Sequence, residues 1–266
     1  MNPEILKSQL TELRLLTAAR EIETVLATQK KAVSLSWVSE LLERETDSRR
    51  EKSLQTRIKK ACFPEITTLE SFDFRFNPDI DEEKIRDLAT LKFLDQNQIA
   101  LFLGAPGVGK THLALAIGVL AVQDGARVYC TSAKRLGQDI RLANLKGTLD
   151  QLFKKILSAK LWIIDDWGVI SMNRDVAEEI FDLMDRRKHS SAMILTSNRD
   201  VSEWSQVFPD PVIANATVDR IFDRARIVLF KGQSYRLKGR IQPDELTDKE
   251  IERKVGKKLD GAEAKQ

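Results

Sequence analysis

The sequence is poor in the residues that build most metal and redox sites. It has 2 cysteines, Cys62 and Cys130, in no metal-like spacing, and 2 histidines, His112 and His189. The cysteines are expected to be reduced thiols of a cytoplasmic protein. The scarcity of histidine argues against a histidine-based metal site or catalytic triad. No apolar run approaches the roughly 20 residues that a membrane-spanning helix needs, so no membrane contact is expected.

Charge of one sign does not dominate, because the net charge is only +3 over 266 residues. Two stretches are nevertheless basic. Residues 44–60 hold seven Lys and Arg against three Asp and Glu, and residues 220–258 hold twelve against six. This distribution favours a polyanionic partner, most simply nucleic acid. On charge alone, solvated helix faces of mixed charge explain it equally well.

A complete phosphate-binding loop is present. Its residues, in order, are Gly104, Ala105, Pro106, Gly107, Val108, Gly109, Lys110 and Thr111. The glycines let successive backbone N–H groups point at the α- and β-phosphates of a nucleotide. Lys110 is predicted to reach the β- and γ-phosphates, and the Thr111 hydroxyl to ligate Mg²⁺. The pattern therefore predicts binding of a nucleoside triphosphate with Mg²⁺, against the alternative of an ordinary glycine turn.

The surroundings of this loop predict an α/β fold. An apolar run at 98–103 precedes it, and an Ala- and Leu-rich helical pattern at 111–122 follows it. Further apolar runs of strand length at 127–131, 161–165, 192–197 and 226–230 alternate with helical patterns. This alternation predicts a parallel sheet with helices on both faces.

Four regions are predicted along the chain. Residues 1–64 form a small helical domain, with amphipathic helices that include 34–43 and 54–61. Residues 65–82 are an irregular linker with alternating phenylalanines, and a helix over 82–94 leads into the first strand. The nucleotide-binding domain covers 83–242. The charged residues 243–266 are predicted to be a flexible tail.

An acidic pair ends the strand at 161–165. Ligands of open α/β sheets bind at the carboxyl ends of the strands. We therefore predict that Asp165 holds Mg²⁺, directly or through water, and that Asp166 polarises the attacking water. Asp is one methylene shorter than the Glu of many such ATPases, which predicts slow turnover. A helix-capping role remains the alternative for Asp166.

The strand at 192–197 ends in Thr-Ser-Asn, and Asn198 follows Asp165 by 33 residues. The position of Asn198 just after this strand predicts a sensor residue, whose side chain faces the γ-phosphate of the nucleotide. Together with Asp166 it is expected to hold the water that attacks this phosphate. Taken alone, the segment 196–200 would be an ordinary turn.

Two arginines follow on the predicted helix at 212–224. Arg220 and Arg224 are four residues apart and are expected to share one helix face. Neither has an evident role at the phosphate site of its own subunit. A guanidinium from a neighbouring subunit can neutralise transition-state charge, so both are candidates for a trans-acting finger. Local pairing with Asp219 and Asp223 is the alternative.

Four segments together carry a family resemblance. They are Gly-Ala-Pro-Gly-Val-Gly-Lys-Thr-His-Leu-Ala at 104–114, Ile-Ile-Asp-Asp-Trp-Gly at 163–168, Ile-Leu-Thr-Ser-Asn-Arg at 194–199 and Val-Asp-Arg-Ile at 218–221. The chain resembles AAA+ ATPases of the helicase-loader clade, and most closely the IstB-like helpers of transposition. The Asp-Asp-aromatic-Gly form, and Lys-Gly-Gln-Ser-Tyr-Arg-Leu at 231–237, look more like IstB than like DnaC-type loaders.

The resemblance implies an AAA+ P-loop NTPase core without the usual helical lid, beside a small N-terminal helical domain. It implies a protein that binds ATP, forms a homo-oligomer through the ATP interface and assembles on duplex DNA. It further implies that this assembly presents a target site to a partner transposase and stimulates it. DNA contacts are expected to be mostly to phosphates, and hence strongly salt-dependent.

Two other functions remain open from the sequence. A DnaC-like replicative helicase loader would prefer single strands and a helicase ring as its partner. A nucleotide-dependent scaffold would use ATP only to hold subunits together, without a need for hydrolysis.

Overall fold

A computed structural model describes residues 3–27, 36–188 and 190–237. His189 and the predicted tail 243–266 lie outside the described residues.

Five parallel strands form one sheet in the order β2-β3-β4-β1-β5. They are β1 (Ile99–Gly104), β2 (Val128–Ser132), β3 (Leu161–Asp165), β4 (Ala192–Ser197) and β5 (Ala225–Phe230). Each strand falls within a residue of its predicted run. The parallel sheet flanked by helices is therefore confirmed.

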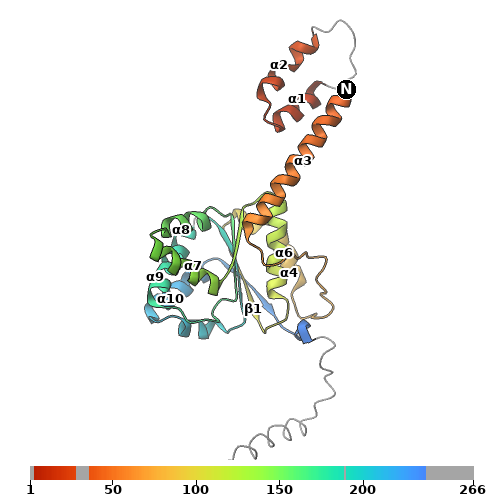
Figure 1. Cartoon of the computed structure of the whole chain (residues 1–266). Helices are drawn as coiled ribbons and strands as arrows, with labels where there is room; N and C mark the ends of the chain where they lie inside the picture. The colour runs from red at the N-terminus through yellow and green to blue at the C-terminus, as the bar shows by residue number, and fades with distance from the viewer. Residues whose placement is uncertain (1–2, 28–35, 189, 238–266) are drawn as a thin grey trace, which may run out of the picture.

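Helices cover both faces of the sheet (Figure 1). One face carries α4 (Glu82–Ala89), α6 (Lys110–Gln123) and the end of α3 (Ser36–Ala61). The other carries α7 (Ala133–Lys146), α8 (Leu149–Leu157), α9 (Arg174–Arg187) and α10 (Pro211–Phe222). The shorter elements are α5 (Lys92–Asp95) and the 3₁₀ helices η1 (Val201–Val207) and η2 (Tyr235–Leu237).

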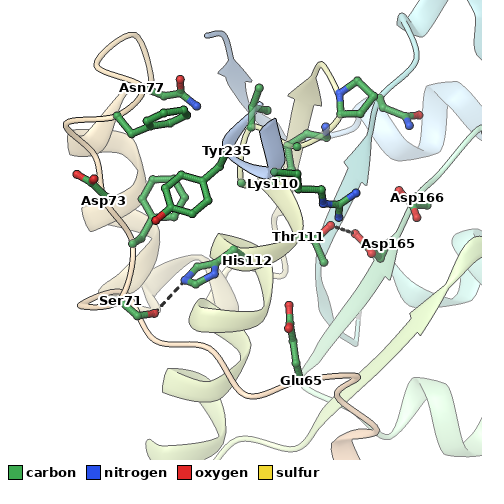
Figure 2. Close-up of a pocket in the computed structure, with 18 residues that line it drawn as sticks. Glu65, Ser71, Asp73, Asn77, Lys110, Thr111, His112, Asp165, Asp166 and Tyr235 are labelled. Carbon is green, nitrogen blue, oxygen red and sulfur yellow. Dashed lines mark hydrogen bonds between the residues drawn. The ribbon is translucent and has the colours of Figure 1, made fainter. Parts of the chain in front are cut away.

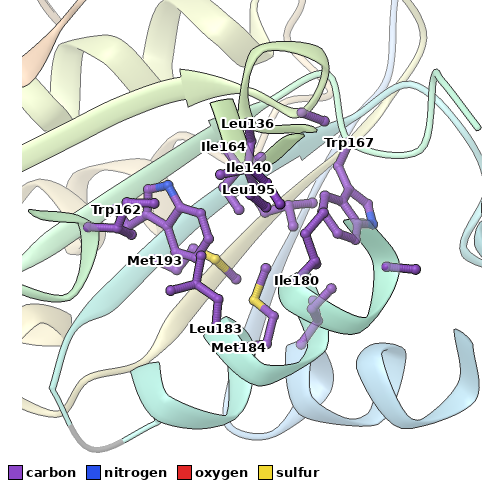
Figure 3. Close-up of a cluster of buried hydrophobic side chains, with 14 of the residues drawn as sticks. Leu136, Ile140, Trp162, Ile164, Trp167, Ile180, Leu183, Met184, Met193 and Leu195 are labelled. Atoms are coloured by element: carbon purple, nitrogen blue, oxygen red, sulfur yellow. The ribbon is translucent and has the colours of Figure 1, made fainter. Parts of the chain in front are cut away.

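Alternate strand residues supply the two cores, as the two-residue period of a strand requires. Figure 3 shows the larger one, in which Trp162 and Met193 of adjacent strands pack against Leu183 and Met184 of α9. On the opposite face, Ile163 contributes to the core under α6. Because both faces of the sheet are buried, the strand sequences are apolar throughout and do not alternate between apolar and polar residues.

The N-terminal region consists of α1 (Pro3–Glu12), α2 (Leu16–Ala27) and the first turns of α3, which share a small cluster. The prediction of separate helices at 34–43 and 54–61 is wrong, because α3 runs unbroken over 26 residues. Residues 44–53 contain neither Gly nor Pro, and Glu40–Arg44 and Glu45–Arg49 form i,i+4 ion pairs there. Figure 1 shows α3 extending from the core toward α1 and α2.

The stretch from 65 to 95 differs in part from its prediction. The predicted helix over 82–94 is divided into α4 and α5, because Leu91 adopts a left-handed φ of 63°. Residues 65–81 form no helix or strand, as predicted. Phe72 and Phe74 anchor this linker on the core under α6, so its path over the nucleotide loop is held by apolar contact.

Within the described residues, no helix is both long and apolar enough to cross a membrane.

Candidate nucleotide-binding site

The phosphate loop joins the end of β1 to the start of α6, so the N-terminus of that helix is directed at the loop. Gly109 caps the helix with a left-handed φ of 103°. The Lys110 ammonium donates hydrogen bonds to the carbonyl oxygens of Gly104 and Ala105, at 2.7 and 2.6 Å. Burial lowers the pKa of Lys110, and the carboxylates of Asp166 and Asp165 oppose that shift. The cation is therefore partly desolvated, which strengthens its attraction to a phosphate.

Asp165 lies at the centre of a hydrogen-bond network that joins the strands β3 and β4 to helix α6. Its Oδ1 accepts hydrogen bonds from the Thr111 hydroxyl at 2.8 Å and from the Thr196 hydroxyl at 2.5 Å. The Thr196 oxygen in turn accepts the backbone N–H of Asp166 at 3.1 Å. Figure 2 shows Thr111 and Asp165 facing each other. A carboxylate and a hydroxyl that converge in this way are oxygen donors of the kind that suit Mg²⁺, so Thr111 and Asp165 fit the predicted metal.

Asp166 has a strained backbone, with a positive φ of 55°. Such strain is kept where the surroundings over-determine it, often at functional sites. Its side chain lines the same cavity as Lys110. Burial and the neighbouring carboxylate of Asp165 raise the pKa of Asp166, whereas Lys110 and Arg236 lower it.

A cavity of about 420 Å³ lies at this edge of the sheet, a size typical of a small-molecule site. The structure brings together there most of the residues predicted from the sequence. These are Pro106, Gly107, Val108, Gly109, Lys110, Thr111, Asp165, Asp166 and Asn198. Gly104 and Ala105, the first two residues of the loop, do not line the cavity, and their carbonyl oxygens accept the hydrogen bonds from Lys110.

The other end of the cavity is aromatic and comes from segments for which the sequence predicted no role. Phe72 and Phe76 of the linker and Tyr235 of η2 line it. The Phe76 and Tyr235 rings meet edge to face at 5.0 Å between centroids. His112 fixes the linker, because its Nε2 lies 3.0 Å from the Ser71 hydroxyl (Figure 2). An aromatic end beside a phosphate end suits a nucleotide, whose base is planar and apolar on its faces.

Arg220 and Arg224 do not line this cavity. The Arg220 guanidinium donates to Asp185 of α9 at 2.8 Å and to Asp219 at 3.4 Å. The expectation that both arginines share one helix face is wrong. Helix α10 ends at Phe222, and Arg224 follows in the turn with a φ of 61°. Arg224 is exposed and Arg220 is half-buried, so both are at the surface of the subunit.

Sequence reasoning missed Thr196 and Arg236 as site residues. Thr196 stands in the predicted sensor strand, but only the pairing of β3 with β4 places its hydroxyl on Asp165. Arg236 lines the cavity from a segment that follows β5. Its signal was present in the sequence, because Lys-Gly-Gln-Ser-Tyr-Arg-Leu at 231–237 contributed to the family resemblance.

Comparison with known proteins agrees with this geometry. The family model for "IstB-like ATP binding protein" matches residues 7–243. A protein named as an ATP-binding protein of insertion sequence IS21, from Pseudomonas aeruginosa, is 35% identical over 240 residues, which is 90% of this chain and 91% of the relative. One named for insertion sequence IS5376, from Geobacillus stearothermophilus, is 37% identical over 209 residues, covering 78% and 83%. The family resemblance drawn from the motifs is confirmed.

Among solved structures, AMPPCP-bound DnaA from Aquifex aeolicus matches with a TM-score of 0.53 at 22% identity. The match covers 71% of this chain and 59% of that chain. Likeness at this level concerns the fold, which is that of AAA+ P-loop ATPases.

Proposed function

Since this chain belongs to the family of IstB-like ATP binding proteins, we propose that it is an ATP-dependent, DNA-binding regulator of transposition. It assembles on duplex target DNA and recruits or stimulates a partner transposase. The observation that carries the proposal is the convergence of Lys110, Thr111, Asp165 and Asp166 in one cavity. The association of its relatives with insertion sequences supplies the context. A cytoplasmic location is part of the proposal, because a bacterial target DNA lies in that compartment.

ATP hydrolysis is assigned to this cavity. The loop and Lys110 bind the phosphates, and Thr111 and Asp165 hold Mg²⁺, which neutralises phosphate charge when bound. Asp166 orients and polarises the lytic water, and Asn198 holds that water from the neighbouring strand. The shortness of the Asp166 side chain predicts slow turnover, which suits an enzyme used as a timed switch.

Helix α3 supports a role for nucleic acid. Lys52 and Lys59 lie two turns apart on one side of the helix, and Lys60 is adjacent. All three are exposed, and none forms an ion pair with another residue in the described part of the chain. Unpaired cations on a projecting helix are available to DNA phosphates. Binding through them is expected to be independent of sequence.

The homo-oligomer is proposed to form through the ATP interface. Arg220 and Arg224 stand at the surface near the end of α10, away from the cavity of their own subunit. In the edge strand β5, which follows Arg224 in the sequence, Ile227 and Leu229 are 40% and 53% exposed. A neighbouring copy that covered these apolar side chains would receive the arginines at its own nucleotide.

The experiment that tests the proposal is binding to a labelled duplex of a few helical turns. It is run with ATP, with ADP and without nucleotide, at two salt concentrations, while particle size is measured. Cooperative, ATP-dependent and salt-sensitive assembly on the duplex is expected. The triple variant Lys52→Ala/Lys59→Ala/Lys60→Ala should reduce the slope of log K against log salt by about one for each phosphate that the protein no longer neutralises. Lys146→Ala/Lys154→Ala, which removes exposed charge from α7 and α8, is the control.

Each alternative function is distinguished by a further measurement with single strands, a helicase ring or the transposase. A preference for single strands together with binding to a helicase ring would replace the proposal with the helicase loader. Asp166→Asn separates the switch from the scaffold. Unchanged DNA assembly and unchanged stimulation of the transposase in this variant would identify a scaffold in which hydrolysis has no role.

A further inference from the structure

A buried serine connects the two segments that carry Asp166 and Asn198. Ser197 is the last residue of β4, is fully buried and directly precedes Asn198. Its hydroxyl donates a hydrogen bond to the carbonyl oxygen of Trp167 at 2.8 Å, and Trp167 directly follows Asp166. The ends of β3 and β4 are thus joined beside both residues, by a side chain that does not itself line the nucleotide cavity.

The Ser197 hydroxyl uses its full hydrogen-bonding capacity, which is one donor and two acceptor positions. Its hydrogen is directed to Trp167, since the other carbonyl oxygen in reach, that of Arg199, is farther away at 3.3 Å. Its oxygen accepts the backbone N–H of Arg199 at 3.1 Å and the indole Nε1–H of Trp204 at 3.2 Å. The orientation of the hydroxyl is therefore fixed, because any rotation would leave a buried polar group without its partner.

These hydrogen bonds stabilise the strained backbone of Asp166. A positive φ of 55° persists only where the surroundings over-determine it. Both backbone groups of the next residue, Trp167, are held by β4. Its N–H donates to the carbonyl oxygen of Thr196 at 2.8 Å, and its carbonyl oxygen accepts the hydrogen bond from Ser197. The Trp167 ring is fully buried in the core shown in Figure 3. Relaxation of Asp166 would reorient the adjoining peptide groups and disturb these contacts.

Asn198 is held by the same hydroxyl. The hydrogen bond from the Arg199 N–H to Ser197 spans Asn198 and closes a turn of the kind that serine side chains form two residues on. Trp204 of η1 supports the hydroxyl from the opposite side, and its ring packs against the backbone of Gly168. A Cβ at Gly168, which has a φ of 81°, would stand 3.2 Å from the Trp204 Cδ1. One side chain therefore fixes the backbone next to both Asp166 and Asn198.

We propose that Ser197 is the positioning residue that sets the separation of Asp166 and Asn198, so that both side chains reach one water molecule at the terminal phosphate. The inference rests on the proposed function, because it takes these two residues to hold the lytic water. Its consequence is that turnover depends on Ser197 while nucleotide affinity does not. Lys110 is held by carbonyl oxygens of the phosphate loop and not by this hydroxyl.

The test compares turnover with binding in the full chain. Ser197→Ala should lower the rate constant of ATP hydrolysis by about tenfold to a hundredfold, the effect of a small misplacement of reacting groups. The affinities for a non-hydrolysable ATP analogue and for ADP should stay within about threefold. Ser197→Cys keeps a weak donor and acceptor and should lie between Ser197→Ala and the wild type. Unchanged turnover, or a loss of affinity as large as the loss of turnover, would overturn the role of Ser197.

Ser191→Ala is the matched control. Ser191 is also buried and directly precedes β4, at the end of the strand away from the cavity. Its hydroxyl has no hydrogen-bond partner among the described residues, so its removal should change neither turnover nor affinity. A loss of turnover in this control as large as that in Ser197→Ala would show that any buried serine of the strand has the same effect, and would contradict positioning.

A second variant carries the test if Ser197→Ala fails to fold, as judged by circular dichroism. Trp204→Phe removes the indole donor and leaves Ser197 bonded to Trp167 and Arg199. Turnover should fall by about threefold to tenfold, the effect of losing one neutral hydrogen bond, again without loss of nucleotide affinity. Wild-type turnover in Trp204→Phe, or an equal loss of affinity, would count against the proposal.

The two proposals fail in different ways. If the wild-type chain hydrolyses no ATP, or if Asp166→Asn hydrolyses it at the wild-type rate, the proposed function fails. If Asp166→Asn abolishes hydrolysis and Ser197→Ala leaves it unchanged, only the role of Ser197 is refuted.

Discussion

Charged residues are concentrated at two sites of the molecule, and their partners differ between the two sites. The first site is the nucleotide cavity. There, Lys110, Asp165, Asp166 and Arg236 face a common space. The second place is the α9–α10 corner, formed by Asp185, Lys188, Arg220 and Asp223. In this corner Arg220 pairs with Asp185 at 2.8 Å, and Lys188 with Asp223 at 2.9 Å. The cavity presents its charges to a ligand, whereas the corner neutralises its own.

The contrast indicates how each place can act. The cavity residues already surround the space that a nucleotide would occupy in their own subunit. Arg220 can reach a neighbour's nucleotide only if it exchanges Asp185 for phosphate. Such an exchange is inexpensive, because surface ion pairs of this kind contribute about 0–1 kcal/mol. The corner is thus suited to a contact made on assembly, and the cavity to one made in the monomer.

The largest effect is expected when the cavity loses its central cation. Lys110→Ala should abolish ATP binding, because the ammonium is the partly buried charge closest to the loop. It should also abolish ATP-dependent assembly on DNA. Calorimetric titration with ATP and ADP provides the measurement. Retained affinity for nucleotide would refute the assignment of the phosphate loop.

The next largest effect concerns the corner. Arg220→Ala should spare nucleotide binding but lower DNA-stimulated hydrolysis by about a thousandfold if it acts as a trans-acting finger. Mixing this variant with Asp166→Asn offers the sharper test. In mixed oligomers, one subunit supplies the arginine and the other the catalytic carboxylate, so activity should return in part. Without any recovery, the trans-acting role loses its support, and Arg224 becomes the residue to test.

A smaller effect should follow from the network that supports the cavity. Thr196→Val keeps the shape of the side chain but removes the hydroxyl that joins Asp165 to the backbone of Asp166. Hydrolysis should fall about tenfold, and the free energy of unfolding by about 1–2 kcal/mol, because a buried polar group loses its partner. Steady-state turnover and urea denaturation measure the two. Ser205→Ala, at an exposed site away from the network, is the control.

The smallest effect should come from releasing the corner. Asp185→Asn weakens the partner of Arg220 and should change the free energy of unfolding by less than about 1 kcal/mol. If Arg220 acts on a neighbour, the same variant should keep or raise DNA-stimulated hydrolysis. A severe loss of hydrolysis would mean that the pair orients Arg220 rather than restrains it.

Much of the fold was predictable because its signals are local. Strand-length apolar runs predicted the five strands, and Gly-x₄-Gly-Lys-Thr predicted the loop between β1 and α6. The errors are local as well. Helix α3 is continuous where two helices were expected, because ion pairs at i,i+4 sustain its polar middle. The helix before β1 is divided because Leu91 takes a conformation that its residue type does not signal.

The site residues that lie in or beside a sequence motif could be predicted, and those that lie outside the motifs could not. The predicted site residues lie at or just after the ends of β1, β3 and β4. They meet at the cavity because parallel strands end at one edge of the sheet. These residues are Lys110, Thr111, Asp165, Asp166 and Asn198. Thr196, Arg236 and the aromatic wall lie outside this rule. Their positions depend on which strands are neighbours in the sheet. They also depend on how the linker and the segment after β5 cross the phosphate loop.

By itself, the sequence determined the chemistry of this protein: a nucleotide loop, an acidic pair and a sheet able to present both. Those features depend on backbone freedom, charge and periodicity within a few residues. Only the tertiary structure decided which residues complete the site. The order β2-β3-β4-β1-β5 places Thr196 on Asp165, and the hydrogen bonds between Asn77 and the backbone of Gln233 hold the segment that carries Arg236 at the cavity. These contacts join residues 31 and 156 positions apart, and no local pattern encodes such a pairing.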